Sequence, residues 1–390
     1  MFSSLPLELI LLLLSYLDRD RKADQDTLRS LSLTSLACLG PCQSIIFYHT
    51  KLDSLDSGRR LLNLLLSSPR IAAYVKRVTI SDAVDGASGN GWLRADPNLA
   101  LALRKLNPKQ IHRLTLNLQP GGSWGNLASA LRKSIVDICK SPALIDLDMQ
   151  WAPLALAGVC SPTLKRLRLF HPSLGPATDI NPVPRPFDIV LEELELWSAL
   201  DGVAEFFFDP SNQISLNDLR ELEVVAYSSK YHSHVQLLLD QCRRSLETFY
   251  FRPGGQIANS AEHMLSVSQC PTLTTLCLTI NAPDPPLSLP WTANFVSSIP
   301  SRSAIEILEL DLRFGKGPVH RGQIHGEEGS VISRALRNIG IFIAKPTSLP
   351  RLRALEIGIQ SEKASDVRSL RSWVREALAI PPERNLLHWV

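Results

Sequence analysis

Apolar residues recur along most of this chain in one pattern, LxxLxLxx, in which positions 1, 4 and 6 are apolar. The pattern occurs nine times: IHRLTLNL from Ile111, LIDLDMQW from Leu144, LKRLRLFH from Leu164, LEELELWS from Leu191, LRELEVVA from Leu219, LETFYFRP from Leu246, LTTLCLTI from Leu273, IEILELDL from Ile305 and LRALEIGI from Leu352. Four successive intervals between starting points are 27 or 28 residues long. Positions 4 and 6 share one face of a β-strand, because side chains alternate along a strand. Each occurrence therefore predicts a short strand with one buried face.

Helical patterns fill several intervals between these predicted strands, at residues 126–140, 233–245 and 260–270. A strand followed by a helix about every 27 residues predicts an α/β repeat, namely an irregular leucine-rich-repeat solenoid over residues 70–362. The strands should form a parallel concave sheet and the helices should cover its outside, because one repeat cannot bury its own apolar face.

Other segments interrupt or end the predicted repeats. YVKRVTI, residues 74–80, indicates an irregular first strand, and residues 172–187, 281–290 and 314–329 are predicted to be loops that leave the array. Residues 365–378 predict an amphipathic helix. Its apolar side carries Val367, Leu370, Trp373, Val374 and Leu378. We expect residues 363–390 to form a capping helix and tail, since the open end of a repeat array must be covered.

The N-terminal stretch LPLELILLLLSYL, residues 5–17, is the most apolar part of the chain. Pro6 suits the first turn of a helix, and Glu8 in that turn favours the positive end of the helix dipole. On the helical period, Glu8 and Ser15 fall on one narrow stripe, and leucine and isoleucine cover most of the remaining circumference. A helix this apolar must be buried on more than one side, so we expect a partner surface.

A secretory signal or a membrane span explains this stretch less well. No Lys or Arg precedes the apolar run, Glu8 interrupts its start, and the charged SYLDRDRK follows it, whereas a signal peptide has the opposite flanks. Residues 6–17 would make a helix of about 18 Å, against about 30 Å of hydrocarbon in a bilayer. We therefore favour a docking helix.

A small helical unit at residues 1–55 is completed by two further elements. Residues 18–26 are a charged break, and TLRSLSLTSLACLG is predicted to be a second helix, capped by Asp26 and ended near Gly40 and Pro41. Residues 42–52 should form a third short element.

The charge and cysteine content restrict the compartment and the partners. The 390 residues contain 41 Lys and Arg against 38 Asp and Glu, a net charge of +3, so the overall charge does not favour nucleic acid or a membrane surface as partner. The seven cysteines are odd in number, scattered, and without a CxxC pair. A reducing compartment, cytoplasmic and/or nuclear, is therefore expected.

The N-terminal stretch and the repeats together resemble F-box proteins, especially fungal F-box proteins that carry degenerate leucine-rich repeats. Residues 5–52 carry the resemblance, through Leu5-Pro6, Glu8-Leu9, Leu13, Ser15-Tyr16-Leu17 and SLTS at 32–35. Leu36 and Cys38 stand where that family often has a basic residue and a tryptophan.

The resemblance implies that the helices contact the Skp-type adaptor of a cullin ubiquitin ligase and that the repeats hold a protein substrate. The implied adaptor contacts are Leu5, Pro6, Leu9, Ile10, Leu13 and Leu17. The alternative is that these residues pack entirely onto the first repeat, as apolar stripes commonly do.

Positions 3, 5 and 7 of the repeats should face outward on the concave sheet. They carry nine acids, Asp146, Asp148, Glu193, Glu195, Glu221, Glu223, Glu309, Asp311 and Glu356, and four bases, Arg113, Arg166, Arg168 and Arg252. Aromatic residues also occupy these outward positions. We expect a substrate to contact Asp148, Arg168, Phe170, Glu195, Trp197, Glu223 and Tyr250, with the aromatic residues as anchors. The predicted ligand is a basic and apolar protein segment. Alternatively, the charges only solvate an exposed sheet.

Motifs of the common enzyme classes are missing from the sequence: there is no GxSxG, no phosphate loop ending in GK[ST], and no HExxH. GASGNG at 86–91 is interpreted as a flexible turn, and His232 and His234 as a polar turn and helix cap. His320 and His325 lack further metal ligands nearby. We expect a non-catalytic substrate receptor without metal or cofactor. The alternatives are a repeat scaffold that binds no adaptor and an extracellular repeat protein with a signal peptide.

Overall fold

The computed structural model describes residues 6–17, 21–82, 91–94, 96–120, 124–174, 180, 187–198, 200–226, 228, 231–253, 265–281, 288–313, 327–345, 347–360, 364–381 and 386–390. The chain is an α/β protein with twelve parallel strands in these residues, as the repeated pattern predicts. It divides into two compact units. The first unit consists of Met1–Ile189 and Ser211–Gln213, and the second unit consists of Val190–Pro210 and Ile214–Val390.

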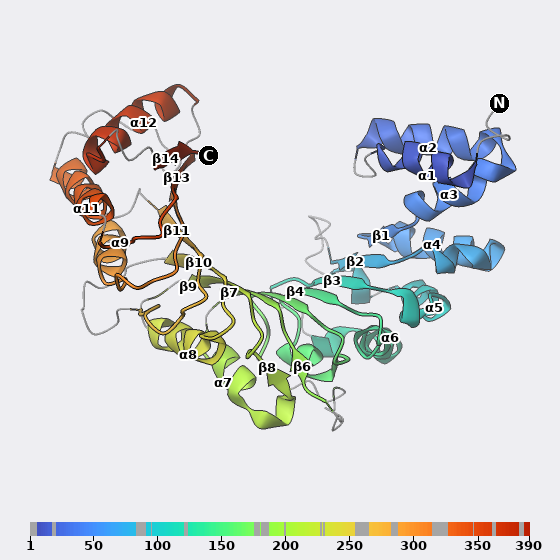
Figure 1. Cartoon of the computed structure of the whole chain (residues 1–390). Coiled ribbons are helices and arrows are strands. Elements are labelled where there is room, and N and C mark those ends of the chain that lie inside the picture. Colours follow the sequence, from blue (N-terminus) through green and yellow to red (C-terminus); the bar gives the residue numbers. More distant parts are fainter. Residues whose placement is uncertain are drawn as a thin grey trace. The chain divides into compact units, whose positions relative to one another are not determined.

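Three helices open the first unit: α1 (Leu7–Ser15), α2 (Lys22–Thr34) and α3 (Leu36–Ile46) (Figure 1). Ile10 and Leu14 of α1 are buried against Leu28 of α2 and against Cys38 and Cys42 of α3. The three helices thus share a small apolar core of their own.

The predicted boundaries of the second and third helical elements are wrong. The predicted break near Gly40 and Pro41 lies inside α3, and the chain breaks instead at Ser35, whose backbone is extended. The Ser35 hydroxyl accepts a hydrogen bond from the Cys38 N–H at 3.2 Å, as an N-cap residue does. Thr34 therefore ends one helix and Leu36 starts the next.

Five parallel strands follow in the first unit: β1 (His49–Leu52), β2 (Arg77–Ser81), β3 (Arg113–Asn117), β4 (Asp146–Gln150) and β5 (Arg166–Phe170). The segments between them contain α4 (Leu55–Ser67), α5 (Pro97–Lys105), α6 (Ser129–Cys139) and the 3₁₀ segments Pro69–Ala73, Trp92–Arg94, Pro108–Gln110, Trp124–Asn126 and Leu154–Val159. Helices α4, α5 and α6 lie on one side of the strands, and the other side stays open (Figure 1).

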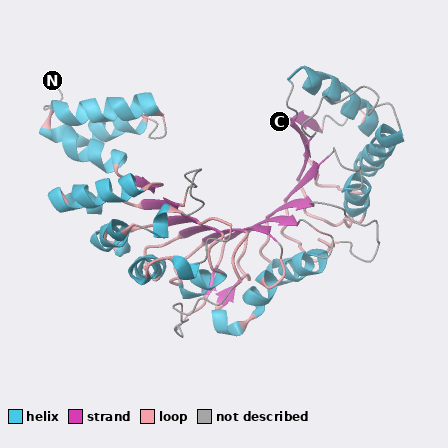
Figure 2. Ribbon diagram, turned by 180° about the vertical axis from the view of Figure 1, so that it is seen from behind, coloured by secondary structure: helices cyan, strands magenta, loops and turns pink. Residues whose placement is uncertain are grey.

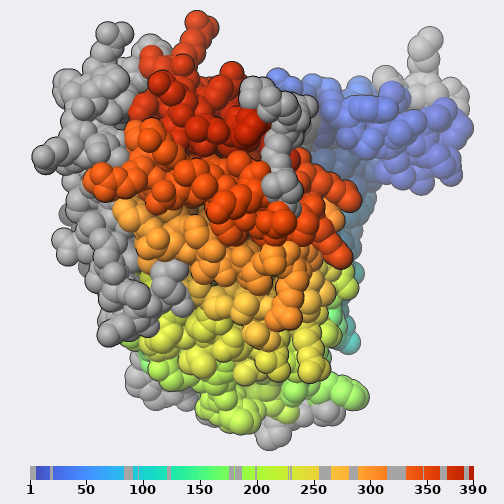
Figure 3. Space-filling view, turned by 60° about the vertical axis from the view of Figure 1, so that its left-hand side comes forward, coloured from blue at the N-terminus to red at the C-terminus, as the bar shows by residue number. Residues whose placement is uncertain are grey.

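The second unit repeats this arrangement with β7 (Glu193–Ser198), β9 (Glu221–Ala226), β10 (Thr248–Pro253), β11 (Thr275–Asn281), β12 (Ile307–Arg313), β13 (Ala354–Gln360) and β14 (Leu387–Trp389). Its helices are α7 (Val203–Phe208), α8 (His232–Cys242), α9 (Ser288–Ser297), α11 (Glu327–Ala344) and α12 (Ala364–Leu378). The strands and helices of this unit form separate layers (Figure 2), and α9, α11 and α12 cover its outer face (Figure 3). Between the main strands, β6 (Ile189–Val190) pairs with β8 (Ile214–Ser215), next to the 3₁₀ segment Pro210–Asn212.

The nine predicted strands are confirmed. In every one, positions 4 and 6 are buried, from Leu114 and Leu116 in β3 to Leu355 and Ile357 in β13. These side chains face the helices, so the odd positions lie on the open side, which we call the open strand face. The first strand expected at 74–80 is β2, and the short strand β1 precedes it.

The helices predicted at 126–140, 233–245 and 365–378 are confirmed as α6, α8 and α12. The helix predicted at 260–270 is wrong over residues 265–270, which form extended chain and a turn; residues 260–264 lie outside the described residues. The long interval after β12 contains the 18-residue helix α11, so residues 327–329 are helical and not loop. Residues 86–90 and 314–326, the latter with both loop histidines, lie outside the described residues.

His232 is not part of a polar turn. It is a buried residue of α8, and its ring packs against Phe251 and Trp291 with centroid separations of 5.7 and 5.2 Å. Trp291 in turn stacks on Phe295 at 5.2 Å. These rings form an aromatic cluster in the core between the strands and helices of the second unit.

Candidate functional site

Helix α1 has two apolar faces. Ile10 and Leu14 are 4% and 3% exposed and belong to the core of the helical unit. Leu9, Leu12 and Leu13 are 46%, 52% and 54% exposed. These three residues, together with exposed Tyr16, recur at the helical spacing of one face and form what we call the outer α1 face. This face presents apolar surface that no other described part of the chain covers fully.

The residues expected to contact an adaptor differ in their solvent exposure. Pro6, Leu9 and Leu13 are exposed, whereas Ile10 lies in the core and Leu17 packs against it while partly buried. Leu5 lies outside the described residues. Ile10 therefore holds α1 in place, and the exposed residues are the ones that can meet a partner.

Six exposed apolar residues of the helical unit were not predicted as adaptor contacts: Leu7, Leu11, Leu12, Tyr16, Leu33 and Leu36. Leu33 and Leu36 flank the α2–α3 break and are 86% and 89% exposed. Helical spacing from Leu9 would have found Leu12 and Tyr16. The exposure of the outer α1 face also means that its leucines do not pack entirely onto the strands of the first unit.

The open strand face of the first unit is basic. Its side chains include Lys51, Arg77, Arg113, Arg166 and Arg168 against Asp146 and Asp148. Lys51 and Arg77 were missed because β1 and β2 lie outside the repeated pattern. Arg77 stacks over the Tyr48 ring at 5.4 Å.

Asp146 sits at the centre of an ion-pair network and is only 4% exposed. Its carboxylate oxygens lie 3.5 Å from Arg113, 3.4 Å from Arg166 and 3.3 Å from Arg168. Asp146 occupies an outward repeat position, as the alternation predicts, but it is buried because three guanidinium groups enclose it. Asp148 lies 3.6 Å from Arg113, and burial raises its pKa in spite of the neighbouring arginines.

The residues expected to bind a substrate are divided between the units. Asp148, Arg168 and Phe170 belong to the first unit, and Asp148 pairs in register with Arg168.

Next to half-buried Phe170, two residues with positive φ follow β4 and β5. Trp151 and His171 have φ values of 57° and 49°, and their rings stack at 4.7 Å. Such backbone conformations are strained for non-glycine residues.

The open strand face of the second unit is acidic. It carries Glu193, Glu195, Glu221, Glu223, Glu309, Asp311 and Glu356 against Arg252 and Arg313. Glu193 is directly opposite Glu221, and Glu195 is directly opposite Glu223. Adjacent strands are about 4.8 Å apart, and like charges at that spacing repel each other. A cationic ligand would be attracted to this row of carboxylates.

Trp197 is partly covered by the protein itself. The Arg252 guanidinium lies 4.8 Å from the centre of its ring. In register, Val225 of β9 lies between Trp197 of β7 and Arg252 of β10. Because the cation–π pair spans β9, Val225 is only 2% exposed although it occupies an outward position. Trp197 can therefore serve as an anchor only at the ring edges that Arg252 leaves open.

Tyr250 lines a hollow of about 160 Å³ on the same face, together with residues of β9 to β12. Burial, and then the nearby Cys277 and three glutamates, raise the pKa of Tyr250 to about 12. The Cys277 thiol donates a hydrogen bond to Glu309 at 3.1 Å, and Asp311 pairs with Arg313 at 2.7 Å. Tyr250 thus offers a neutral hydroxyl within an acidic hollow.

Groups for metal chemistry are not assembled in the described segments, where no three His, Cys, Asp or Glu side chains come together as a metal site. All seven cysteines are buried free thiols. Among the described helices, none is both long and apolar enough to cross a bilayer.

No protein-family model matches this chain, and no curated protein matches it either.

Proposed function

We propose that this chain is the non-catalytic substrate-recognition subunit of an SCF-type cullin ubiquitin ligase. The N-terminal helices would bind a Skp-type adaptor, and the strands of the leucine-rich-repeat-like region would bind a protein substrate. The observation that carries the proposal is the outer α1 face, where Leu9, Leu12 and Leu13 are half exposed while Ile10 and Leu14 of the same helix are buried. An amphipathic helix with a free apolar face fits the hydrophobic groove of a partner.

The adaptor proposal is tested by co-expressing the full chain with a Skp-type adaptor and measuring the dissociation constant of the complex. Leu9→Asp with Leu13→Asp should weaken binding at least 100-fold. A fully buried leucine contributes about 1.5–3 kcal/mol, so the exposed halves of two leucines contribute about 2 kcal/mol, and burying two carboxylates adds a desolvation penalty. Circular dichroism should stay unchanged, because both side chains lie outside the core.

Leu101→Asp is the matched control, since Leu101 is also an exposed leucine on a helix, at 50% exposure on α5. It should leave adaptor binding intact. Failure of the wild-type chain to bind an adaptor would overturn the proposal. In that case the chain would be a protein-interaction scaffold without ubiquitin-ligase association.

The substrate surface is proposed to be the open strand face of the second unit, which we call the acidic strand face. Its expected contacts are Glu195, Trp197, Glu223 and Tyr250. Its carboxylates favour a basic segment, and its partly open rings favour apolar side chains. The chain should therefore bind a peptide of alternating arginine and leucine more tightly than one of glutamate and leucine. Glu195→Lys with Glu223→Lys should abolish that preference while adaptor binding persists.

The control for this test carries the same change of charge on helices of the second unit. Glu205→Lys in α7 with Glu376→Lys in α12 should preserve the preference for the basic peptide. Equal loss in both double variants would show that net charge, and not the acidic strand face, governs binding.

A further inference from the structure

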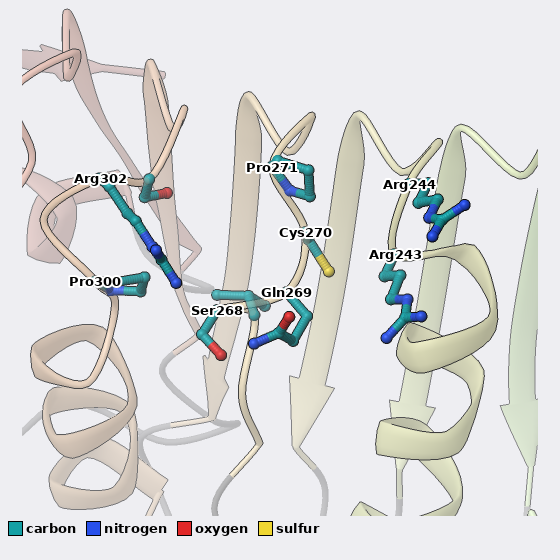
Figure 4. A pocket seen from close by; sticks show the side chains of 10 residues that line it. Arg243, Arg244, Ser268, Gln269, Cys270, Pro271, Pro300 and Arg302 are labelled. Carbon is teal, nitrogen blue, oxygen red and sulfur yellow. The ribbon is translucent and has the colours of Figure 1, made fainter.

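A second hollow of the second unit lies at the ends where its strands begin, and its chemistry is opposite to that of the acidic strand face. It has a volume of about 510 Å³. Three connecting segments line it: Arg243 and Arg244 after α8, residues 267–271 before β11, and residues 300–303 before β12. Figure 4 shows Arg243 and Arg302 on opposite sides, with Ser268 and Gln269 between them.

Charge is the first property that defines this hollow. Arg243, Arg244 and Arg302 line it, and none of its lining residues is acidic. Within the described residues, no ion pair or hydrogen bond occupies these three guanidinium groups. Asp240, whose charge acts on the neighbouring Cys270, does not line the hollow and accepts a hydrogen bond from Gln236 at 2.8 Å. Three exposed cations with no acid among the lining residues make the hollow positive.

Hydrogen-bonding groups are the second property. Ser268 and Ser303 add hydroxyl groups to the lining, and Gln269 adds an amide. The Ser303 hydroxyl oxygen accepts from the Ile305 N–H at 3.3 Å, so its own O–H can still donate. Guanidinium, hydroxyl and amide groups together are donors suited to a tetrahedral oxyanion.

The lining segments are held by short turns and buried residues. The Cys270 N–H donates to the Val267 carbonyl at 3.0 Å, and the Ser303 N–H donates to the Pro300 carbonyl at 2.9 Å. Val267 and Cys270 are 6% and 4% exposed and fix the middle segment in the core. The backbone that carries the donors is therefore positioned before any ligand arrives.

We propose that this hollow, defined by Arg243, Arg244 and Arg302, binds a phosphate monoester carried by a protein segment. A phosphate monoester has nearly two negative charges at neutral pH and three acceptor oxygens, which matches several guanidinium groups better than a single carboxylate does. The volume exceeds that of a phosphate group and leaves room for the residue that carries it. The proposal does not depend on adaptor binding by the α1 face.

The test is calorimetric titration of the full chain with four probes: a phosphoserine pentapeptide, its unphosphorylated form, inorganic phosphate and inorganic sulfate. The phosphopeptide should bind at least tenfold more tightly than its unphosphorylated form. Phosphate-dependent binding should strengthen from about pH 5 to pH 7.5, because the second phosphate pKa is about 6, whereas sulfate binding should stay constant. Cys270 contributes no charge over this range, since burial raises its pKa to about 11.

Arg243→Gln and Arg302→Gln should each weaken phosphopeptide binding about tenfold, the loss of one charge-assisted hydrogen-bonding group. Arg334→Gln is the control, because Arg334 is an exposed arginine of α11 that does not line the hollow. Because Arg243, Arg302 and Arg334 are all exposed, the three variants should keep the wild-type circular dichroism and melting temperature.

Two results would show that the hollow is not a phosphate site. One is the absence of binding by every phosphate probe up to about 10 mM, and the other is an equal effect of Arg334→Gln and Arg243→Gln. Inorganic phosphate that binds as tightly as the phosphopeptide would overturn the protein-borne source and assign the hollow to a small phosphate compound. These results are separable from the adaptor test, which uses different variants on α1.

Discussion

Replacing Asp146 by alanine should destabilise the first unit more than the loss of any single surface ion pair. The carboxylate lies within 3.3–3.5 Å of Arg113, Arg166 and Arg168, and its side chain is 6% exposed. The variant leaves the three guanidinium groups close together without the Asp146 carboxylate that offsets their mutual repulsion. Removing one partner of a fully buried ion pair costs about 3–5 kcal/mol, but the three arginine side chains are 27–41% exposed and water can solvate them, so we expect a cost of about 1–3 kcal/mol.

Burial, and not the shortness of the contact, determines this magnitude. The Arg59–Asp56 pair is shorter, at 2.7 Å, but its side chains are 65% and 59% exposed. Exposed pairs contribute about 0–1 kcal/mol, because water solvates both groups after the pair is broken. Asp56→Ala should therefore lower the free energy of unfolding by at most about 1 kcal/mol.

Hydrogen exchange of peptides that cover β3 to β5 measures the effect where it arises, with peptides of β11 to β13 as an internal reference. We expect the opening free energy of β3 to β5 to fall by about 1–3 kcal/mol in Asp146→Ala. A fall no larger than that of Asp56→Ala would refute the reasoning, since it would mean that the arginines are solvated well enough without Asp146.

Three further predictions concern single side chains. Burial raises the pKa of the Asp148 carboxyl, so the folded state favours the protonated carboxyl and the protein loses stability as pH rises through that pKa. Asp148→Asn should therefore match the wild-type melting temperature near pH 3 and exceed it at neutral pH. Gly340→Ala should lower the free energy of unfolding in urea by about 1–3 kcal/mol, because the new Cβ would collide with the Leu378 carbonyl oxygen. Gly40→Ala, also in a helix, should not destabilise the protein, because the nearest atom to its Cβ would be the Tyr74 hydroxyl oxygen at an ordinary 3.8 Å. The difference between the ultraviolet titration curves of the wild-type protein and of Tyr250→Phe should show a tyrosine with a pKa of about 12. A midpoint near 10 would contradict the buried, acidic surroundings of Tyr250.

The strands could be predicted from the sequence where two alternating positions of each are buried. Phe249 and Phe251 of β10 show the pattern clearly, and all nine repeats obey it. The strand β1 escaped prediction because only Leu52 of its four residues is buried. Helix α11 escaped prediction because residues 314–329, which include its first three residues, are polar and glycine-rich and suggested a loop.

Contacts across strands could not be predicted, because they depend on register and on side-chain direction. The Arg252–Trp197 pair joins residues 55 positions apart across an intervening strand. The enclosure of Asp146 likewise requires strands on both sides to supply arginines at matching positions. On α1, the periodic pattern indicated excess apolar surface, and only the packing of Ile10 and Leu14 decided which side of the helix remains exposed.

The distribution of charge on the strands decides what each open face can bind. The sequence offers nine acids and four bases at outward repeat positions as one set, and the net charge of the chain is only +3. The division of the chain into two units separates that set, so the first unit is basic and the second unit is acidic on this face. Neighbouring strands are about 4.8 Å apart and the Debye length at physiological salt is about 8 Å, so charges on adjacent strands act together while distant ones are screened. A ligand therefore responds to the local row of charges, and a basic segment should select Glu195 and Glu223 over the arginine-rich strands of the first unit.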